Sequence, residues 1–260
     1  MSKTTITFLG TSSVVPASGH DTASFVINGS ILVDCGWYAP LRMKSYGLDP
    51  MKIESLILTH CHHDHYLGLP QLLFHLAMRR ADVPNRPPLR IVGPAADLST
   101  VIELSKKFLQ QSRFPDAVFP TDLVALTAGS GYECDAFRLA TCESKHPVPA
   151  LCYRFTDKAT GANLAFTGDT APHEPIIKHV RGVSLLIHEA SYGADPAPKE
   201  NKWGHSGAPD AARIALEAKV KRLALVHCAE EDQPAALAAA KKTFPNTFWP
   251  ADGKSVTIDG

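Results

Sequence analysis

Four histidines, an aspartate and a cysteine stand together in the hexapeptide HCHHDH, residues 60–65. The chain has only 12 histidines in 260 residues, so four within six positions is a high local concentration. Imidazole is the commonest metal-binding side chain, and a carboxylate adds the negative charge that a second cation needs. Because residues two apart on a helix point away from each other, a turn must carry this motif. We predict metal ligation by four of its members: His60, His62, Asp64 and His65.

Four local ligands cannot complete two metal sites, so the prediction requires partners elsewhere in the chain. Three candidates each follow a strand-like segment: His146 after FRLATCESK, Asp169 after NLAFTG and His227 after RLALV. Ligands at the ends of several strands would converge in one cleft at a sheet edge. Other histidines are interpreted as ordinary surface or packing residues, namely His63, His75, His173 and His179. Cys61 is interpreted as a small filler, with a thiolate ligand as the alternative.

Hydrophobic patterns place these residues on an order of strands and helices. We expect a strand in TITFLG (5–10) and a hairpin in SFVINGSILVD (24–34), whose Asn28-Gly29 pair suits a type I′ turn. Further strands are expected at 55–58, 89–93, 136–142, 150–156, 163–167, 183–187, 222–226 and 255–258. Helices are expected at 68–80, 96–111, 173–180, 208–218 and 233–243. No linker interrupts this order, so we predict one domain, residues 1–260, of layered α/β type with helices outside stacked sheets.

Composition and charge restrict the function classes. Lys plus Arg and Asp plus Glu both number 26, so the sequence has no strong electrostatic footprint for nucleic acid. No apolar span reaches 18 residues and the N-terminal sequence has no signal-peptide pattern, which predicts a cytoplasmic protein without membrane contact. The six scattered cysteines form no CxxC pair and are expected to be reduced thiols. The sequence is compatible with a homodimer.

HCHHDH resembles the signature of the metallo-β-lactamase superfamily, and the resemblance covers nearly the whole chain. The sequence is most similar to the ribonuclease Z-like branch, whose motifs resemble FLGTSSVVP (8–16), VDCG (33–36), AFTGDT (165–170), LIHEAS (186–191) and WGHSG (203–207). This resemblance implies a four-layer αββα sandwich with Asp34 in a structural position. It also implies two divalent transition metals, zinc first and manganese or iron as alternatives. By resemblance, His60, His62 and His146 hold one metal, Asp64, His65 and His227 hold the other, and Asp169 bridges them.

The resemblance implies a dinuclear metal-dependent hydrolase. Two metals about 3.5–4 Å apart can share a hydroxide and clamp the oxygens of a displacement at phosphorus. The leaving alkoxide needs a proton, which by resemblance His205 of GHSG donates while Glu189 of HEAS orients it. The residues expected to take part in catalysis are Asp64, Glu189 and His205.

Three features argue against precursor tRNA as the substrate. Only 22 residues separate His146 from Asp169, too few for the long tRNA-gripping arm that short-form ribonuclease Z enzymes carry there. His227 is followed by CAEEDQP, where that family has a serine and an arginine that hold phosphate, and VDCG is followed by WYAP instead of a Glu-Gly-Thr-Gln run. We therefore predict a phosphodiesterase that acts on a small phosphodiester, such as a cyclic nucleotide or a cyclic sugar phosphate.

Three alternatives are kept. The first is a ribonuclease Z-like tRNA 3′ endonuclease, and the second is a hydrolase of lactones, carboxylic esters or sulfate esters, since the same hydroxide attacks carbonyl carbon. The third is a metal-binding redox or sensor protein without hydrolytic activity, although related di-iron domains usually carry a carboxylate where His62 stands. Three aromatic residues flank the expected site loops and are candidates for stacking on a base or ring: Trp37, Tyr38 and Trp203.

Overall fold

Two seven-stranded mixed sheets form the centre of the computed structural model, which describes residues 3–260. The first sheet contains β1 (Thr4–Gly10), β2 (Ser24–Ile27), β3 (Ile31–Val33), β4 (Ser55–Ile57), β5 (Leu89–Pro94), β6 (Thr121–Leu126) and β14 (Ser255–Ile258), in the order β14-β1-β2-β3-β4-β5-β6. The second contains β7 (Gly131–Glu133), β8 (Phe137–Ser144), β9 (Ala150–Asp157), β10 (Asn163–Phe166), β11 (Leu185–Glu189), β12 (Leu223–Val226) and β13 (Thr247–Phe248), in the order β13-β12-β11-β10-β9-β8-β7.

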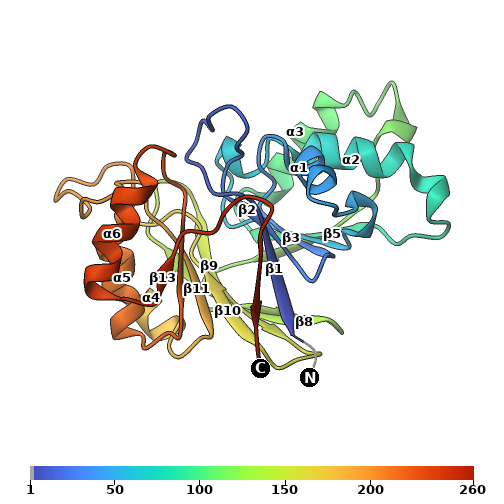
Figure 1. Ribbon diagram of the computed structural model, residues 1–260. Helices are drawn as coiled ribbons and strands as arrows, with labels where there is room; N and C mark the ends of the chain where they lie inside the picture. The colour runs from blue at the N-terminus through green and yellow to red at the C-terminus, as the bar shows by residue number, and fades with distance from the viewer. Residues whose placement is uncertain (1–2) are drawn as a thin grey trace.

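Helices cover the outer face of each sheet (Figure 1). The first sheet is covered by α1 (Ala39–Ser45), α2 (Leu69–Met78) and α3 (Leu98–Phe108), and the second by α4 (Glu174–His179), α5 (Ala208–Glu217) and α6 (Gln233–Thr243). The buried leucines of α2 recur at helical spacing and face the sheet. The helices α5 and α6 instead bury mostly alanines, which allow the two helices to approach closely.

Alternation along the strands produces three apolar layers. In β2, Phe25 and Ile27 face the layer between the two sheets, while Val26 faces the helices α1 to α3. The rings of Phe25 and Phe166, one from each sheet, meet edge to face with centroids 5.5 Å apart. Helix, sheet, sheet and helix therefore follow one another, which confirms the αββα sandwich.

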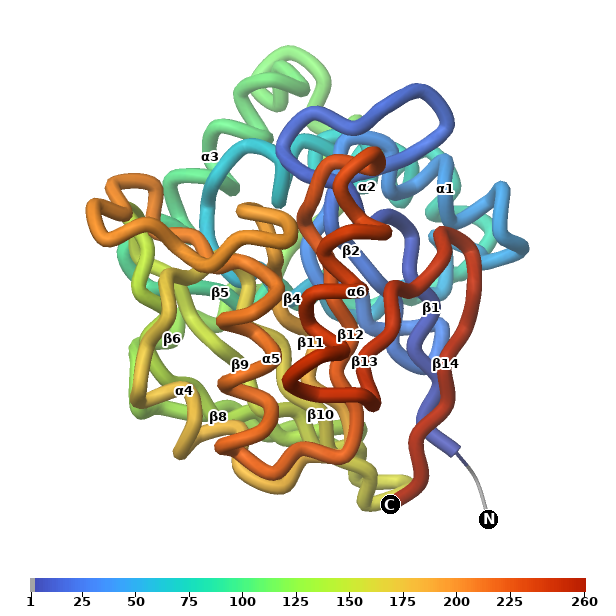
Figure 2. Tube along the Cα trace, turned by 60° about the vertical axis from the view of Figure 1, so that its left-hand side comes forward, coloured from blue at the N-terminus to red at the C-terminus, as the bar shows by residue number. Residues whose placement is uncertain are grey.

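The predicted hairpin is confirmed, with one extra residue in its turn. Asn28 and Gly29 both have positive φ, of 50° and 72°, and the N–H of Ser30 donates to the carbonyl of Ile27. Ile27 then pairs with Ile31 across a three-residue connection. The strands β1 and β14 lie at opposite ends of the sequence. They pair antiparallel and lie side by side in Figure 2.

Several elements differ from the sequence prediction. Four short ones were not predicted: α1, β6, β7 and β13. β6 is largely solvent-exposed and α1 spans only two turns, so neither has a long apolar pattern. The helix predicted at 96–111 ends at Phe108, because Gln110 adopts a positive φ of 52°. No helix among residues 3–260 is long and apolar enough to cross a membrane.

One edge of the sandwich collects the carboxyl ends of several strands. In the second sheet β10, β11 and β12 are parallel, and β8 runs in the same direction because both β8 and β10 pair antiparallel with β9. The first sheet meets this edge where β4 ends, since the N–H of Leu151 donates to the carbonyl of Thr59 at 3.0 Å. Loops that follow β4, β8, β10, β11 and β12 are thereby brought together.

Candidate metal centre

The side chains predicted as metal ligands converge at this edge. His60 follows β4, and the next three ligands lie on or just before a short 3₁₀ helix at His63–His65. His146 follows β8, Asp169 follows β10 and His227 follows β12. Donor atoms within each of two groups lie within 4.8 Å of one another: His60, His62, His146 and Asp169 form one group, and Asp64, His65 and His227 form the other.

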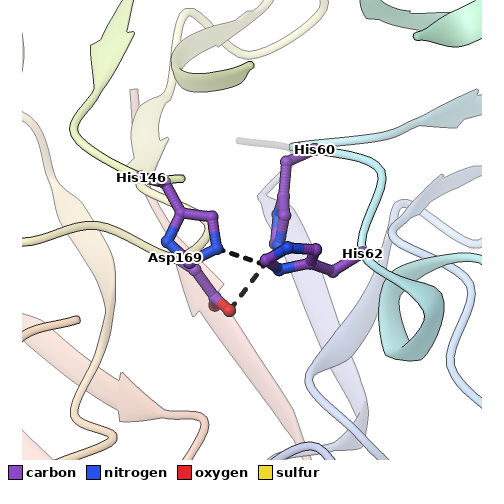
Figure 3. A group of neighbouring side chains, drawn as sticks. All are labelled: His60, His62, His146 and Asp169. Atoms are coloured by element: carbon purple, nitrogen blue, oxygen red, sulfur yellow. Dashed lines mark hydrogen bonds and ion pairs between the residues drawn. The ribbon is translucent and has the colours of Figure 1, made fainter. Parts of the chain in front are cut away.

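In the first group, imidazoles from two separate loops face each other (Figure 3). Nδ1 of His62 lies 2.9 Å from Nε2 of His146. Nε2 of His60 lies 3.6 Å from Oδ2 of Asp169. The four donor atoms all lie within 4.8 Å of one another, which is close enough for a single cation to bind them.

Asp169 of the first group also borders the second group. Oδ2 of Asp64 lies 3.3 Å from Nε2 of His65 and 3.2 Å from Nε2 of His227. Oδ2 of Asp169 lies 3.5 Å and 3.4 Å from the same two nitrogens. One carboxylate oxygen therefore borders both donor groups, which is the position of a bridging ligand.

Unpartnered buried atoms indicate that the residues fit metal ions. Within the described chain, Nε2 of His60, Nε2 of His65 and Oδ1 of Asp169 are buried and have no hydrogen-bond partner. A buried polar atom without a partner costs free energy, so three in one cluster need an explanation. Imidazole nitrogens and carboxylate oxygens are ligands for Zn²⁺, Mn²⁺ and Fe²⁺, and two such cations would satisfy all three atoms.

The side-chain charges of the cluster also suit cations. Burial lowers the pKa of His60 well below its usual value, so this imidazole is neutral and can offer a lone pair. Burial opposes protonation of His227 too, but the carboxylates of Asp169 and Asp64 outweigh it and raise its pKa to about 9. The carboxylates are thus balanced by protons on histidine, and bound cations would displace those protons.

Hydrogen bonds behind the ligands fix the orientation of the imidazoles. Asp34 accepts from Nδ1 of His65 at 2.8 Å and from the hydroxyl and N–H of Thr59, both also at 2.8 Å. The Thr59 oxygen in turn lies 3.1 Å from Nδ1 of His60. With Nδ1 occupied, Nε2 is the nitrogen that each ring presents to the cluster. Asp34 was expected in a structural position, whereas Thr59 was not singled out.

His146 is held by the backbone of a distant loop. Its Nδ1 donates to the carbonyl of Gly204 at 2.9 Å. Gly204 has a positive φ of 65°, and a Cβ there would lie 2.8 Å from Cδ of Pro147 and 3.0 Å from Cα of His146. Only glycine permits this approach. The sequence carried a signal for Gly204, because it directly precedes His205 in the WGHSG motif.

The predicted catalytic pair lies beside the bridging position. Nδ1 of His205 is 2.9 Å from Oε1 of Glu189 and 3.9 Å from Oδ2 of Asp169. Burial opposes protonation of His205, but the hydrogen bond to Glu189 and the charge of that carboxylate outweigh it and raise the pKa of His205. The His205 side chain is 20% exposed and that of Glu189 only 1%, so the imidazole is accessible while its partner is shielded.

Ser191, which was not predicted, joins this pair to the metal ligands. Its hydroxyl donates to Oε2 of Glu189 at 2.7 Å, and its oxygen lies 2.9 Å from Nδ1 of His227. The N–H groups of Thr170, Ser191 and Ser206 also donate to the Glu189 carboxylate. The HEAS motif contains Ser191, so its position two residues after Glu189 was a usable signal.

The other residues that the sequence singled out are three aromatic side chains, four histidines and Cys61. Trp203 is 62% exposed next to Gly204, with Nζ of Lys202 4.8 Å from its ring centroid, and Tyr38 is 43% exposed. Trp37 is half-buried. Among residues 3–260, His63, His75, His173 and Cys61 join no cluster of potential ligands, whereas His179 lies in a separate one with two cysteines.

The sequence of the chain is similar to one superfamily profile and to curated relatives. The profile described as "Beta-lactamase superfamily domain" matches residues 30–228. A ribonuclease Z from Methanothermobacter thermautotrophicus is 29% identical over an alignment of 293 positions, which covers 93% of this chain and 92% of the relative. Since the alignment is longer than this chain, the relative carries segments that have no counterpart here.

Two solved structures share the fold. The metallo-β-lactamase fold protein YhfI from Bacillus subtilis superposes with a TM-score of 0.83 at 23% identity and covers 99% of this chain and 100% of its own. The short form of human tRNase Z superposes with a TM-score of 0.77 at 22% identity and covers 97% of this chain and 98% of its own.

Proposed function

The chain belongs to the beta-lactamase superfamily, and from this membership and the geometry of the site we propose that it is a dinuclear metal-dependent hydrolase of a small phosphodiester. One observation carries the proposal. An accessible imidazole, His205, is held by the buried carboxylate of Glu189 at 2.9 Å, directly beside Asp169 in the candidate metal cluster. A positioned acid next to a metal cluster suits a reaction in which a poor leaving group must be protonated.

Each part of the site has a role in this reaction. The proposed ligands of the two cations are His60, His62, Asp64, His65, His146, Asp169 and His227. Two divalent cations, with zinc as the first expectation, would supply Lewis-acid polarisation of the ester and activation of water at this position. The protein contributes the fixed orientation of the imidazoles through Asp34, Thr59 and Gly204.

His205 is the proposed proton donor. Its Nδ1 faces Oε1 of Glu189 at 2.9 Å and Oγ of Ser191 at 3.2 Å. That leaves Nε2 as the nitrogen that would carry the proton to the leaving alkoxide. The negative charge of Glu189 stabilises the imidazolium before transfer and fixes the tautomer afterwards. Removal of one such acid typically costs on the order of 10² to 10⁴ in rate.

The shape of the chain around the site supports a small substrate. The interval between His146 and Asp169 is filled by β9, a tight turn and β10, all part of the second sheet. Beyond His227, Oε1 of Glu230 accepts from the N–H of Ala17 at 3.2 Å and from the hydroxyl of Ser12. This acidic loop therefore binds a neighbouring loop of the protein, and its negative charge next to His227 disfavours the approach of a polyanion.

A ribonuclease Z-like tRNA 3′ endonuclease is the second candidate. The observation in its favour is the extent of the match to the ribonuclease Z of Methanothermobacter thermautotrophicus, 93% of this chain and 92% of the relative. A phosphodiester bond is the reacting group in both candidates. They differ in the size of the substrate, which the surface around the site must accommodate.

A substrate panel tests the proposal. The metal-loaded enzyme should hydrolyse bis(p-nitrophenyl) phosphate faster than p-nitrophenyl phosphate, a lactone or an aryl sulfate. Activity confined to lactones, carboxylic esters or sulfate esters would move the protein to a different class of hydrolase. Redox activity with bound iron and no hydrolysis of any ester would refute the hydrolase proposal itself.

A further inference from the structure

A second cluster of metal-binding side chains lies outside the candidate metal centre. It consists of Cys142, Cys152 and His179, which come from β8, β9 and α4 and whose donor atoms all lie within 4.8 Å of one another. All six cysteines of the chain are free thiols in the structure. His179 was expected to be an ordinary surface or packing residue, and the two cysteines were expected to be reduced thiols.

The sheet itself brings the two thiols together. Cys142 and Cys152 are direct partners in the antiparallel pairing of β8 and β9. The neighbouring residues Leu151 and Tyr153 point into the layer between the sheets, so the thiol of Cys152 points to the opposite face, where α4 packs. Cys152 is buried and Cys142 is half-buried, so solvent has access to one side of the cluster.

The third member, His179, is the last residue of α4, and one nitrogen of its imidazole ring is buried without a partner among residues 3–260. Its Nε2 is buried, and no hydrogen-bond partner for it exists in the described part of the chain. Burial lowers the pKa of His179 and outweighs the opposing effect of the Ala140 backbone, so the imidazole is neutral and can act as a ligand. Apolar packing explains two cysteines in a core, but it leaves a buried imidazole nitrogen unsatisfied at a free-energy cost.

Two thiols and one imidazole are a soft ligand set. Thiolate sulfur selects Zn²⁺ or Cu⁺ over harder ions such as Mg²⁺ or Mn²⁺. The contact with Cys142 and burial hold the pKa of Cys152 well above its usual value, so metal binding at this position must displace a proton. The guanidinium of Arg154, which donates to the carbonyl of His179 at 3.2 Å, would offset negative charge from the thiolates.

We propose that Cys142, Cys152 and His179 bind one thiophilic metal ion of the Zn²⁺ and Cu⁺ class, at a site separate from the dinuclear centre. The position indicates a structural role. Cys142 lies four residues before His146 on the same chain segment, and β9 begins at Ala150, which pairs with His60. An ion at this position would link β8, which leads into His146, to β9, which pairs with His60, and to α4, the helix that follows Asp169.

Cadmium titration of the reduced protein tests the site, because thiolate-to-cadmium charge transfer gives an ultraviolet band. The proposed dinuclear ligands include no thiolate and are silent in this measurement. The band should reach the amplitude of one Cd²⁺ bound by two thiolates per chain, and excess Zn²⁺ should remove it. Cys142→Ser and Cys152→Ser should abolish the band, and His179→Gln should weaken Cd²⁺ binding while the band remains.

Two matched controls keep the test specific. Cys134→Ser removes a half-buried cysteine of the same region, and Cys61→Ser removes the thiol of the HCHHDH motif; neither should change the band. Absence of the band in the wild-type protein would overturn the proposal. So would a band that survives the Cys142→Ser Cys152→Ser double substitution, or one that Cys61→Ser abolishes.

A measurement on the wild-type protein alone covers the case in which the variants fail to fold. Cd²⁺ or Zn²⁺ should slow alkylation of half-buried Cys142 by iodoacetamide, measured by peptide mass spectrometry. The modification rate of Cys134 should be unaffected and serves as the internal reference. An equal rate at Cys142 with and without the metal would contradict the site.

Discussion

Oε1 of Glu189 lies 2.9 Å from Nδ1 of His205, and the carboxylate that makes this contact is almost completely buried. Its other oxygen accepts from Ser191, whose hydroxyl oxygen lies 2.9 Å from Nδ1 of His227. One buried carboxylate therefore orients both the proposed acid and, through a single hydroxyl, a proposed metal ligand. Changes to this network should affect proton transfer and metal affinity to different extents, which makes the two roles separable by experiment.

His205→Ala should retain the metal content of the wild-type protein and lose on the order of 10² to 10⁴ in the rate of alkyl phosphodiester hydrolysis. The loss should be much smaller for bis(p-nitrophenyl) phosphate, since p-nitrophenolate leaves without protonation. His63→Ala is a matched control, because His63 is exposed and lies in the same motif. Equal impairment on activated and unactivated esters would be incompatible with proton donation, and loss of metal from His205→Ala would make the residue structural.

Glu189 should set the pH range of activity. Burial opposes protonation of His205, but the hydrogen bond and charge of Glu189 outweigh it and raise the pKa, so the donor keeps its proton to higher pH than a free imidazole does. Activity should fall as the pH rises through that raised pKa. Glu189→Gln removes the charge, so this alkaline limb should move to lower pH on unactivated substrates. An alkaline limb at the same pH in both enzymes would assign it to another group.

Gly204→Ala should reduce both activity and metal affinity. Its positive φ and the 2.8 Å approach of a Cβ to Pro147 would displace the carbonyl that orients His146. We expect a loss of about tenfold or more in metal affinity, in the range seen when partners of metal ligands are removed. Gly161→Ala is the control, since Gly161 also has a positive φ, of 77°, but a Cβ there meets nothing within 4 Å. That variant should lose about 1 kcal/mol of stability and keep its activity. Equal effects of both substitutions on metal affinity would assign the effect to backbone strain.

Precursor tRNA should be cut poorly. The interval after His146 is occupied by sheet, and the loop after His227 is acidic and bound to its neighbours. Cleavage of a 3′-extended tRNA, compared with a small cyclic phosphodiester at physiological salt, checks this expectation. Accurate removal of the 3′ trailer with comparable efficiency would favour the ribonuclease Z-like candidate and show that RNA is held by another surface.

The dense HCHHDH motif and the residues at strand ends could be predicted because their signals are local. The end of a strand can be recognised in the sequence where a short apolar run stops. The carboxyl ends of parallel strands then lie at the same edge of the sheet. Ser191 and Thr59 were not singled out, since a hydroxyl becomes important only through the neighbours that the fold supplies; Ser191 lies 36 residues from His227. The edge strand β6 was missed for a related reason, since it is largely exposed and lacks the alternation of a buried strand.

The number of metal ions per chain tests the account most directly. Elemental analysis should be carried out on protein prepared without chelators, in the Cys142→Ser Cys152→Ser background so that the proposed thiolate site contributes nothing. We expect about two transition-metal ions per chain. Because Oδ2 of Asp169 borders both donor groups and His62 belongs to only one of them, Asp169→Ala and His62→Ala should each lose at least one ion, and His63→Ala should lose none. A preparation that contains no transition metal, or an Asp169→Ala variant that keeps both ions, would contradict the dinuclear centre.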